Sequence, residues 1–312
     1  MSFAAVFPGQ GSQSIGMLAN FLPEYHEVKQ VFTEASQVLD YDLWKLIQTG
    51  PDERLNATER TQPALLAVGV ALWRLWQARN GPKSAFMAGH SLGEYTALVC
   101  AGSMDFKTAI KLVEFRGQAM QQAVPPGTGA MAAILGLEDE AVRFACMEAA
   151  QGQVVQAVNF NSPGQVVIAG EKPAVERAMA SCSAKGAKRA ILLPVSVPSH
   201  CALMRPAADK LAARLAELQL KSPQIPIIHN VDVAAHADAA AIRQALKEQL
   251  YSPVRWAETV RSLARQGITK LVEFGPGRVL CGLTKRIDKS VEAYPVYDPQ
   301  TLQAALTAVD AP

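Results

Sequence analysis

Cysteine is scarce in this chain and is not arranged in pairs. No two cysteines have C-x-x-C spacing, and the full set is Cys100, Cys146, Cys182, Cys201 and Cys281. A disulfide framework or a structural zinc site needs regularly spaced cysteines. The sequence therefore predicts reduced thiols in the core or in a pocket, and neither disulfides nor a metal site.

An excess of charge and long apolar runs are also missing. The 30 basic and 28 acidic side chains give a formal net charge of +2, which is too balanced for a protein that neutralises nucleic-acid phosphates. No apolar stretch approaches the roughly 20 residues that cross a bilayer, and the N-terminus has no basic leader. We expect no nucleic-acid partner, no membrane partner and a cytoplasmic location.

What the sequence does contain is an ordinary globular composition in which strands and helices alternate. The 312 residues suit one large domain or a main domain with an insertion. Apolar runs predict strands, and helical stripes predict helices. The expected strands lie at 3–7, 84–88, 225–229 and 270–274, and the expected helices at 62–80, 94–101, 105–122, 201–218 and 254–266. This alternation favours an α/β fold with a mostly parallel sheet and a site at the carboxyl ends of its strands.

The segment between 128 and 195 has a different pattern. Its apolar runs and helical stretches follow the order β-α-β-β-α-β, which is typical of a ferredoxin-like unit. The sequence Val124-Pro125-Pro126-Gly127, just before this segment, ends the helical pattern of 105–122. We therefore predict a main domain formed by 1–127 and 196–312, with a ferredoxin-like subdomain over 128–195 inserted into it.

The most informative motif is Gly89-His90-Ser91-Leu92-Gly93, a G-x-S-x-G string between a predicted strand and a predicted helix. This is the setting of a nucleophile elbow, where small flanking residues leave room for a sharp turn. Ser91 is therefore the candidate nucleophile.

A serine hydroxyl needs a base within hydrogen-bond reach, and histidine is the usual one. His200 stands apart because it ends an extended segment that Pro194 and Pro198 make rigid, at the point where the chain re-enters the main domain. We interpret His90, beside the nucleophile, as a surface or hydrogen-bonded buried residue. The other three histidines are His26, His229 and His236.

Two further features suit acyl transfer. The charge that develops on a carbonyl oxygen needs backbone N–H donors, and the candidates are Leu92 and Gln10, which lies in a glycine-rich loop after the first strand. Arg116 lies on an otherwise apolar helix, and a guanidinium near Ser91 would select an acidic acyl group. Spacing alone leaves open a solvated Arg116 and a purely structural loop.

Several separate motifs, in this order, resemble the malonyl-CoA:acyl carrier protein transacylase family. The resemblance extends from residue 3 to about 287 and implies an α/β-hydrolase-like core with a ferredoxin-like insert. The motifs that carry it are Phe7-Pro8-Gly9-Gln10-Gly11-Ser12-Gln13, Thr61-Gln62-Pro63-Ala64-Leu65, Gly89-His90-Ser91-Leu92-Gly93-Glu94-Tyr95, Asn159-Phe160-Asn161-Ser162-Pro163-Gly164, Val197-Pro198-Ser199-His200 and Gly275-Pro276-Gly277.

The resemblance implies a role for each candidate. Ser91 would attack the thioester of malonyl-CoA, and His200 would take and return its proton. Gln10 and Leu92 would form the oxyanion hole. The malonyl-serine ester would then pass to the phosphopantetheine thiol of acyl carrier protein in a ping-pong cycle that supplies fatty-acid synthesis. No bound cofactor is implied.

Three more residues receive roles only from the resemblance. Arg116 would hold the malonyl carboxylate, and Gln62 would line the pocket. A backbone carbonyl at or near Gln249, rather than an Asp, would orient the imidazole. The family thus implies a Ser-His dyad instead of a triad.

Carrier proteins of this kind are acidic, so a basic rim would speed their encounter with the enzyme. Candidate docking residues are Lys185, Lys188 and Arg189 before a small-domain strand, and Lys285 with Arg286 after the Gly275-Pro276-Gly277 loop. Since charge runs are usually solvated faces, the sequence leaves this role open. We expect a free-standing monomer.

Two other hypotheses fit the same residues. With water as acceptor the same residues would make a thioesterase, and without catalysis the chain would be a malonyl-CoA-binding or carrier-docking protein. The sequence also leaves open whether the pathway is fatty-acid synthesis, polyketide assembly or malonate breakdown.

Overall fold

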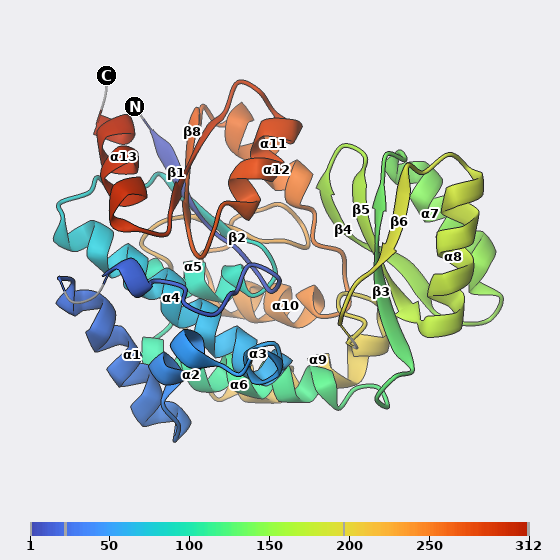
Figure 1. Cartoon of the computed structure of the whole chain (residues 1–312), viewed down its shortest axis with the longest axis horizontal. Helices are drawn as coiled ribbons and strands as arrows, with labels where there is room; N and C mark the ends of the chain where they lie inside the picture. Colours follow the sequence, from blue (N-terminus) through green and yellow to red (C-terminus); the bar gives the residue numbers. More distant parts are fainter. Residues whose placement is uncertain (1, 22–23, 196, 311–312) are drawn as a thin grey trace.

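The computed structural model describes residues 2–21, 24–195 and 197–310. Its larger body contains a parallel sheet with the strand order β7-β2-β1-β8-β9 (Figure 1). The strands are β1 (Phe3–Phe7), β2 (Phe86–Gly89), β7 (Ile227–Ile228), β8 (Lys270–Phe274) and β9 (Glu292–Val296). Residues 1, 196 and 312, at which predicted domain segments begin or end, lie outside the described residues.

Helices cover both faces of this sheet. Phe3 and Phe7 of β1 pack into one core, while Ala4 and Val6 pack into another, as the two-residue period of a strand requires. The first core includes residues of α1, α4, α5 and α6, and the second includes residues of α11 and α12. The helices of this body are α1 (His26–Leu39), α2 (Leu43–Thr49), α3 (Asp52–Leu55), α4 (Thr58–Ala78), α5 (Gly93–Cys100), α6 (Phe106–Gln121), α9 (Arg205–Ala216), α10 (Ala239–Gln249), α11 (Trp256–Arg265), α12 (Val279–Ile287) and α13 (Pro299–Asp310), with 3-10 turns η1 (Ala19–Phe21) and η2 (Ala202–Met204).

A smaller unit lies beside this body and contains an antiparallel sheet with the order β4-β5-β3-β6 (Figure 1). Helices α7 and α8 pack side by side on this sheet, and the two layers share a core of their own. The elements are β3 (Gly129–Leu135), α7 (Asp139–Ala150), β4 (Val155–Ser162), β5 (Gln165–Glu171), α8 (Lys172–Ala184) and β6 (Arg189–Leu192). The predicted fold class, an α/β-hydrolase-like core with an inserted ferredoxin-like unit, is confirmed. The domain boundaries at 128 and 195 stay a prediction.

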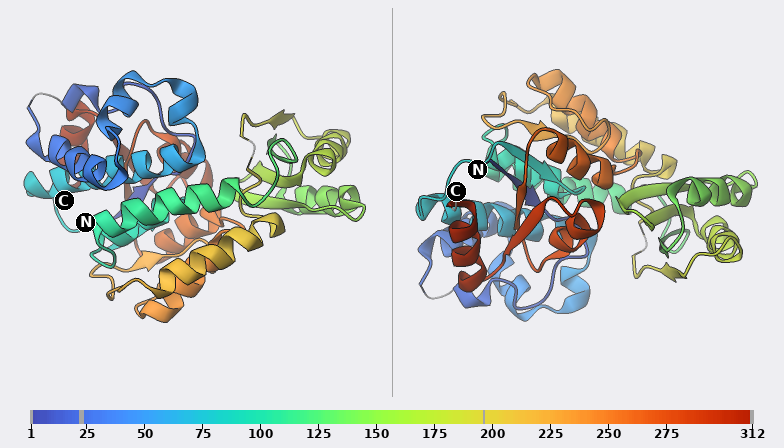
Figure 2. Two further views of the ribbon diagram at one scale, coloured as in Figure 1. Left: turned by 90° about the horizontal axis from the view of Figure 1, so that it is seen from below. Right: turned by 90° about the horizontal axis from the view of Figure 1, so that it is seen from above.

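The small unit is tied to the larger body in two ways. Helices α6 and α9 lie in contact and lead into and out of it (Figure 2). Val254, just before α11, also pairs with β4, because its N–H donates to Val158 O at 2.8 Å and its carbonyl accepts from Phe160 N at 3.0 Å. The segment that follows β6 returns to the larger body, and its Leu193 and Val195 line the same cavity as Ser91.

Element boundaries differ from the sequence prediction where proline lies near an end. The helix predicted over 62–80 already begins at Thr58, with Pro63 inside it rather than in its first turn. The helix predicted over 201–218 is divided into η2 and α9, and Pro206 lies in the first turn of α9, where a missing N–H costs nothing. The strand predicted over 225–229 is only Ile227–Ile228.

Candidate active site

The carboxyl ends of β1 and β2 bring the elbow beside the glycine-rich loop. Phe7 and Gly89 are register partners, and His90 N donates to Phe7 O at 2.9 Å. A Cβ on Gly89 would lie 1.8 Å from the carbonyl carbon of Gly93, and one on Gly93 would lie 2.0 Å from Phe7 O. Both positions therefore require glycine. Ser91 between them has φ 51°, a left-handed conformation that costs a non-glycine residue on the order of 1–3 kcal/mol.

The structure brings Ser91, His200 and Gln249 together from three distant parts of the chain. The Ser91 hydroxyl lies 2.8 Å from His200 Nε2, and His200 Nδ1 lies 2.7 Å from the backbone carbonyl of Gln249. Because a carbonyl only accepts, Nδ1 carries the ring proton and Nε2 presents a lone pair to the hydroxyl. This is the geometry of a nucleophile with its base and an oriented tautomer.

His200 is 4% exposed. Burial, followed by the positive charge of Arg116, lowers the pKa of His200 to about 3. The imidazole is therefore neutral at physiological pH, which is the state that accepts a proton from serine.

Two backbone amides beside Ser91 have no internal acceptor. Within the described part of the chain, neither Leu92 N nor Gln10 N donates a hydrogen bond, while the amide of Ser91 itself is occupied by Asn230 Oδ1 at 2.8 Å. Gln10, Ser91 and Leu92 line one cavity of about 120 Å³. Two free donors beside a nucleophile can stabilise a carbonyl oxygen that gains charge.

Arg116 on α6 is buried next to the nucleophile, with 1% exposure. Nη1 donates to Gln62 Oε1 at 2.9 Å, and Nη2 donates to Gln249 Oε1 at 2.9 Å and to Ser91 Oγ at 3.3 Å. Among the described residues, none of its acceptors is a carboxylate, and Nε is unpaired. A buried guanidinium without a counter-ion favours a substrate that carries one.

Comparison with known proteins identifies the family of this chain. A family model described as an acyl transferase domain matches residues 5–298. A malonyl CoA-acyl carrier protein transacylase from Salmonella typhimurium is 61% identical, over 98% of this chain and 99% of that protein. One from Bacillus subtilis is 43% identical, over 97% and 96%.

The chain belongs to the malonyl-CoA:acyl carrier protein transacylase family. Like the rest of that family it is an acyltransferase.

Solved structures of similar proteins have the same fold. An acyl carrier protein S-malonyltransferase from Vibrio cholerae matches this transacylase-family chain with a TM-score of 0.96 at 64% identity, covering 98% of this chain and 100% of that one. A malonyl-transacylase solved in complex with its type II PKS acyl-carrier protein matches with a TM-score of 0.98 at 60% identity, covering 99% and 100%.

The candidate docking cations of this transacylase-family protein are exposed and lie on separate elements. Arg189 is the first residue of the edge strand β6 and Lys188 directly precedes it, and Lys285 and Arg286 lie in the last turn of α12. Nη1 of Arg286 donates to Gln165 Oε1 at 2.8 Å, which joins α12 to the small unit. No hydrogen bond joins the two pairs within the described residues.

Three buried residues near the site were not singled out from sequence as site residues. Glu94, His229 and Asn230 are each fully buried, and the Glu94 carboxylate is hydrogen-bonded to both of the other two. A glutamate in the first turn of an apolar helix is the one signal that could have pointed to this group. By contrast His90, interpreted as a surface or hydrogen-bonded buried residue, lies 2.8 Å from Asn161 Oδ1 through Nε2.

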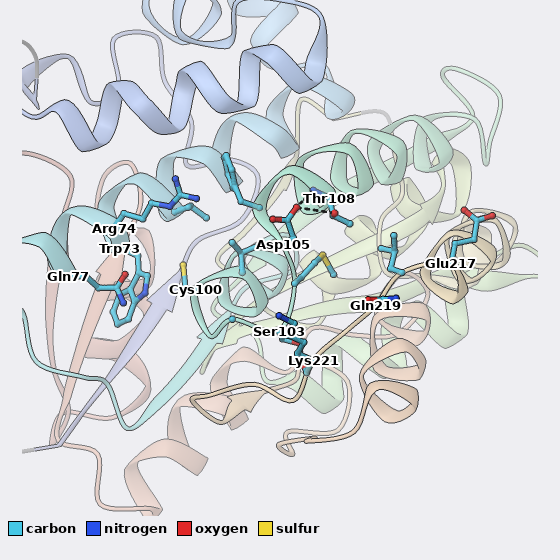
Figure 3. A pocket seen from close by; sticks show the side chains of 16 residues that line it. Trp73, Arg74, Gln77, Cys100, Ser103, Asp105, Thr108, Glu217, Gln219 and Lys221 are labelled. Atoms are coloured by element: carbon cyan, nitrogen blue, oxygen red, sulfur yellow. Dashed lines mark hydrogen bonds between the residues drawn. The ribbon is translucent and has the colours of Figure 1, made fainter.

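A wider cavity of about 760 Å³ lies elsewhere, between α4, the α5–α6 connection and the segment after α9 (Figure 3). Its Asp105 caps α6 by accepting from Thr108 N, and its Arg74 pairs with Glu34. Burial holds the pKa of its Cys100 thiol well above the usual value, so the thiol is a poor nucleophile. This cavity lacks the paired nucleophile and base found at Ser91.

Proposed function

We propose that this protein transfers the malonyl group of malonyl-CoA to the phosphopantetheine thiol of acyl carrier protein through a malonyl-serine ester on Ser91. One observation supports malonyl as the acyl group. Arg116 is buried without a carboxylate partner among the described residues, and its Nη2 lies 3.3 Å from Ser91 Oγ. A malonyl carboxylate would supply the missing counter-ion.

In the first half-reaction, Ser91 Oγ attacks the thioester carbon while its proton moves to His200 Nε2. The negative charge on the carbonyl oxygen is received by the free amides of Leu92 and Gln10. The tetrahedral intermediate collapses with loss of the CoA sulfur, which takes the proton from His200. The malonyl ester remains on Ser91.

In the second half-reaction the carrier-protein thiol gives its proton to His200, and its sulfur attacks the ester carbon. The same amides receive the oxyanion, and Ser91 leaves with the proton that His200 returns. The backbone carbonyl of Gln249 keeps the imidazole in one tautomer through both halves, at 2.7 Å from Nδ1. Gln62 contributes by holding Nη1 of Arg116 at 2.9 Å.

We propose further that the carrier protein docks against Lys188, Arg189, Lys285 and Arg286, whose side chains are exposed. A relative has been solved in complex with its acyl-carrier protein, and an acidic partner would be attracted by these four cations. Fatty-acid synthesis is the pathway that we propose.

The proposed reaction also defines the remaining expectations. Nucleophile, base and oxyanion donors all come from one chain, so we propose a monomer that needs no bound cofactor. No helix among the described residues is long and apolar enough to span a bilayer. Since coenzyme A thioesters and carrier proteins are cytoplasmic reactants, we propose that the protein acts in the cytoplasm.

The decisive test is covalent labelling. The protein is mixed with malonyl-CoA and its intact mass is measured, with Ser91→Ala as the control. We expect one malonyl group on the parent, located at Ser91, and none on the control. An unlabelled parent, with a known transacylase labelled in parallel, would refute the proposal.

A second measurement tests the acyl group. Arg116→Ala removes a charge-assisted contact to the malonyl carboxylate, so it should slow malonyl transfer roughly a hundredfold more than acetyl transfer. Equal losses for the two acyl groups would remove the role of Arg116.

The thioesterase hypothesis is tested by identifying the product of the reaction. Release of free malonate at the rate of CoA release, without carrier protein, would favour water as the acceptor. The non-catalytic reading is tested in a reconstituted synthesis assay, where it requires Ser91→Ala to support the same flux as the parent.

A further inference from the structure

Glu94 places a carboxylate directly behind the catalytic pocket, outside the residues that line it. The side chain is fully buried in the first turn of α5. Its Oε1 lies 2.8 Å from His229 Nδ1, and its Oε2 accepts from Asn230 N at 2.9 Å and from Gln249 Nε2 at 3.0 Å. Two of these partners, Asn230 and Gln249, are themselves hydrogen-bonded to the proposed catalytic and binding residues.

Asn230 holds the elbow. Its Oδ1 accepts from Ser91 N at 2.8 Å, and its Nδ2 donates to Gly89 O at 2.7 Å. These two hydrogen bonds fix the backbone at Gly89 and at Ser91, within the turn in which Ser91 has its left-handed φ of 51°. A strained conformation of this kind persists only where surrounding contacts enforce it.

Gln249 connects Glu94 to the base and to Arg116. Its Nε2 donates to Glu94 Oε2 and, at 3.0 Å, to Ser91 O, while its Oε1 accepts from Arg116 Nη2 at 2.9 Å. Rotating the amide by half a turn would set an NH₂ group against the guanidinium and an oxygen against the carboxylate. The amide therefore has one orientation, and its backbone carbonyl faces His200.

We propose that Glu94 is a positioning residue: its carboxylate fixes Asn230 and the Gln249 amide, and through them sets Ser91, His200 and Arg116 for malonyl transfer. Glu94 touches no substrate. Its negative charge also offsets part of the charge of Arg116 through a single neutral amide, while the guanidinium has no direct contact with this carboxylate. This inference rests on the proposed function.

The test compares Glu94→Gln with Glu273→Gln. Glu273 is a matched control, because it is also fully buried and accepts two backbone N–H groups, from Leu280 at 3.0 Å and Cys281 at 2.8 Å. Unlike Glu94, it accepts no hydrogen bond from Asn230 or Gln249. For each folded variant, urea unfolding is measured first. The rates of Ser91 acylation by malonyl-CoA and by acetyl-CoA are then measured by quenched mass spectrometry.

Glu94→Gln keeps the side-chain shape but brings an NH₂ group among three donors. We expect a loss of roughly 10- to 100-fold in the maximal malonylation rate, the scale of one charge-assisted hydrogen bond. The loss should be greater for malonyl than for acetyl, because the setting of Arg116 is disturbed. Glu273→Gln should lose stability while its malonyl-to-acetyl ratio stays at the parent value.

A second variant covers the case in which Glu94→Gln does not fold. Gln249→Ala removes the side-chain amide and leaves the backbone carbonyl that faces His200, and it should lower the same ratio. Where both variants fold, adding Glu94→Gln to Gln249→Ala should cost at least threefold less than Glu94→Gln alone, because one of the two routes by which Glu94 acts, its contact with the Gln249 amide, is already lost.

The outcomes separate this inference from the proposed function. A parent that does not malonylate Ser91 refutes the function. A parent that does, with Glu94→Gln or Gln249→Ala at the parent rate and ratio, refutes only the positioning role. A ratio that falls equally in Glu273→Gln also refutes it, because any buried glutamate would then have the same effect.

Discussion

The burial of a neutral His200 predicts a specific loss of stability in mild acid. The pKa of this imidazole is about 3 in the folded protein, because of burial and then the charge of Arg116, against an ordinary value of 6.5. Between these two values the unfolded chain binds a proton that the folded protein does not. Lowering the pH through this window therefore favours unfolding, and raising it favours folding.

The size of the effect follows from the two pKa values. At pH 5 the unfolded chain gains about 2 kcal/mol from protonation of His200, and near pH 3 the gain approaches about 4–5 kcal/mol. Above pH 7 the contribution vanishes, because the imidazole is neutral in both states. For a domain of ordinary stability, ~2 kcal/mol is a large share of the free energy of unfolding.

The assay is urea unfolding at pH 7.5 and pH 5.0 for the parent and for His200→Gln, which has no titrating group at this position. Other carboxylates and histidines titrate in both proteins and cancel in the comparison. The free energy of unfolding should fall between the two pH values by about 2 kcal/mol more in the parent than in His200→Gln. Equal falls would show that His200 keeps an ordinary pKa in the folded protein, and the reasoning about its neutral state would be wrong.

Three further predictions follow from the site. Gln62→Glu places a carboxylate against Nη1 of Arg116, now 2.9 Å from an amide oxygen, so malonylation should fall at least tenfold more than acetylation; equal effects would contradict this. Gly93→Ala forces a Cβ to 2.0 Å from a backbone oxygen, and should either prevent folding or abolish malonyl labelling in mass spectra. Replacing Lys285 and Arg286 by Glu should raise KM for acyl carrier protein severalfold and weaken its salt dependence, while the rate of malonyl-enzyme formation stays at the parent value.

The elbow and the order of elements could be predicted because their signals are local. The glycines at 89 and 93 report a close backbone approach, and the apolar run at 3–7 reports a strand buried on both faces. The β-α-β-β-α-β order of the small unit likewise needs only the succession of short patterns along the chain. Each of these features is decided within about ten residues.

The surroundings of the site could not be predicted, because they join residues that are far apart in sequence. Asn230 lies 139 positions along the chain from Ser91, whose backbone N–H donates to its side chain. Gln249 lies 133 positions from Arg116, whose guanidinium donates to its side chain. Neither residue has a motif of its own. Strand β9 was also missed, because a proline at 295 interrupts its apolar pattern and it lies at the sheet edge, where proline is tolerated.

The way in which Arg116 is held explains how a buried cation can serve as a binding group. A direct ion pair with an internal carboxylate would stabilise the guanidinium, but malonate would then have to displace that partner before binding. With amide oxygens from Gln62 and Gln249 as its contacts, the cation is oriented and partly compensated, yet its full charge remains for an incoming carboxylate. The nearest internal acid in this network, Glu94, lies one amide further away and is itself held by three donors. In the proposed function, selectivity for an acidic acyl group would thus depend as much on keeping carboxylates away from Arg116 as on placing Arg116 beside Ser91.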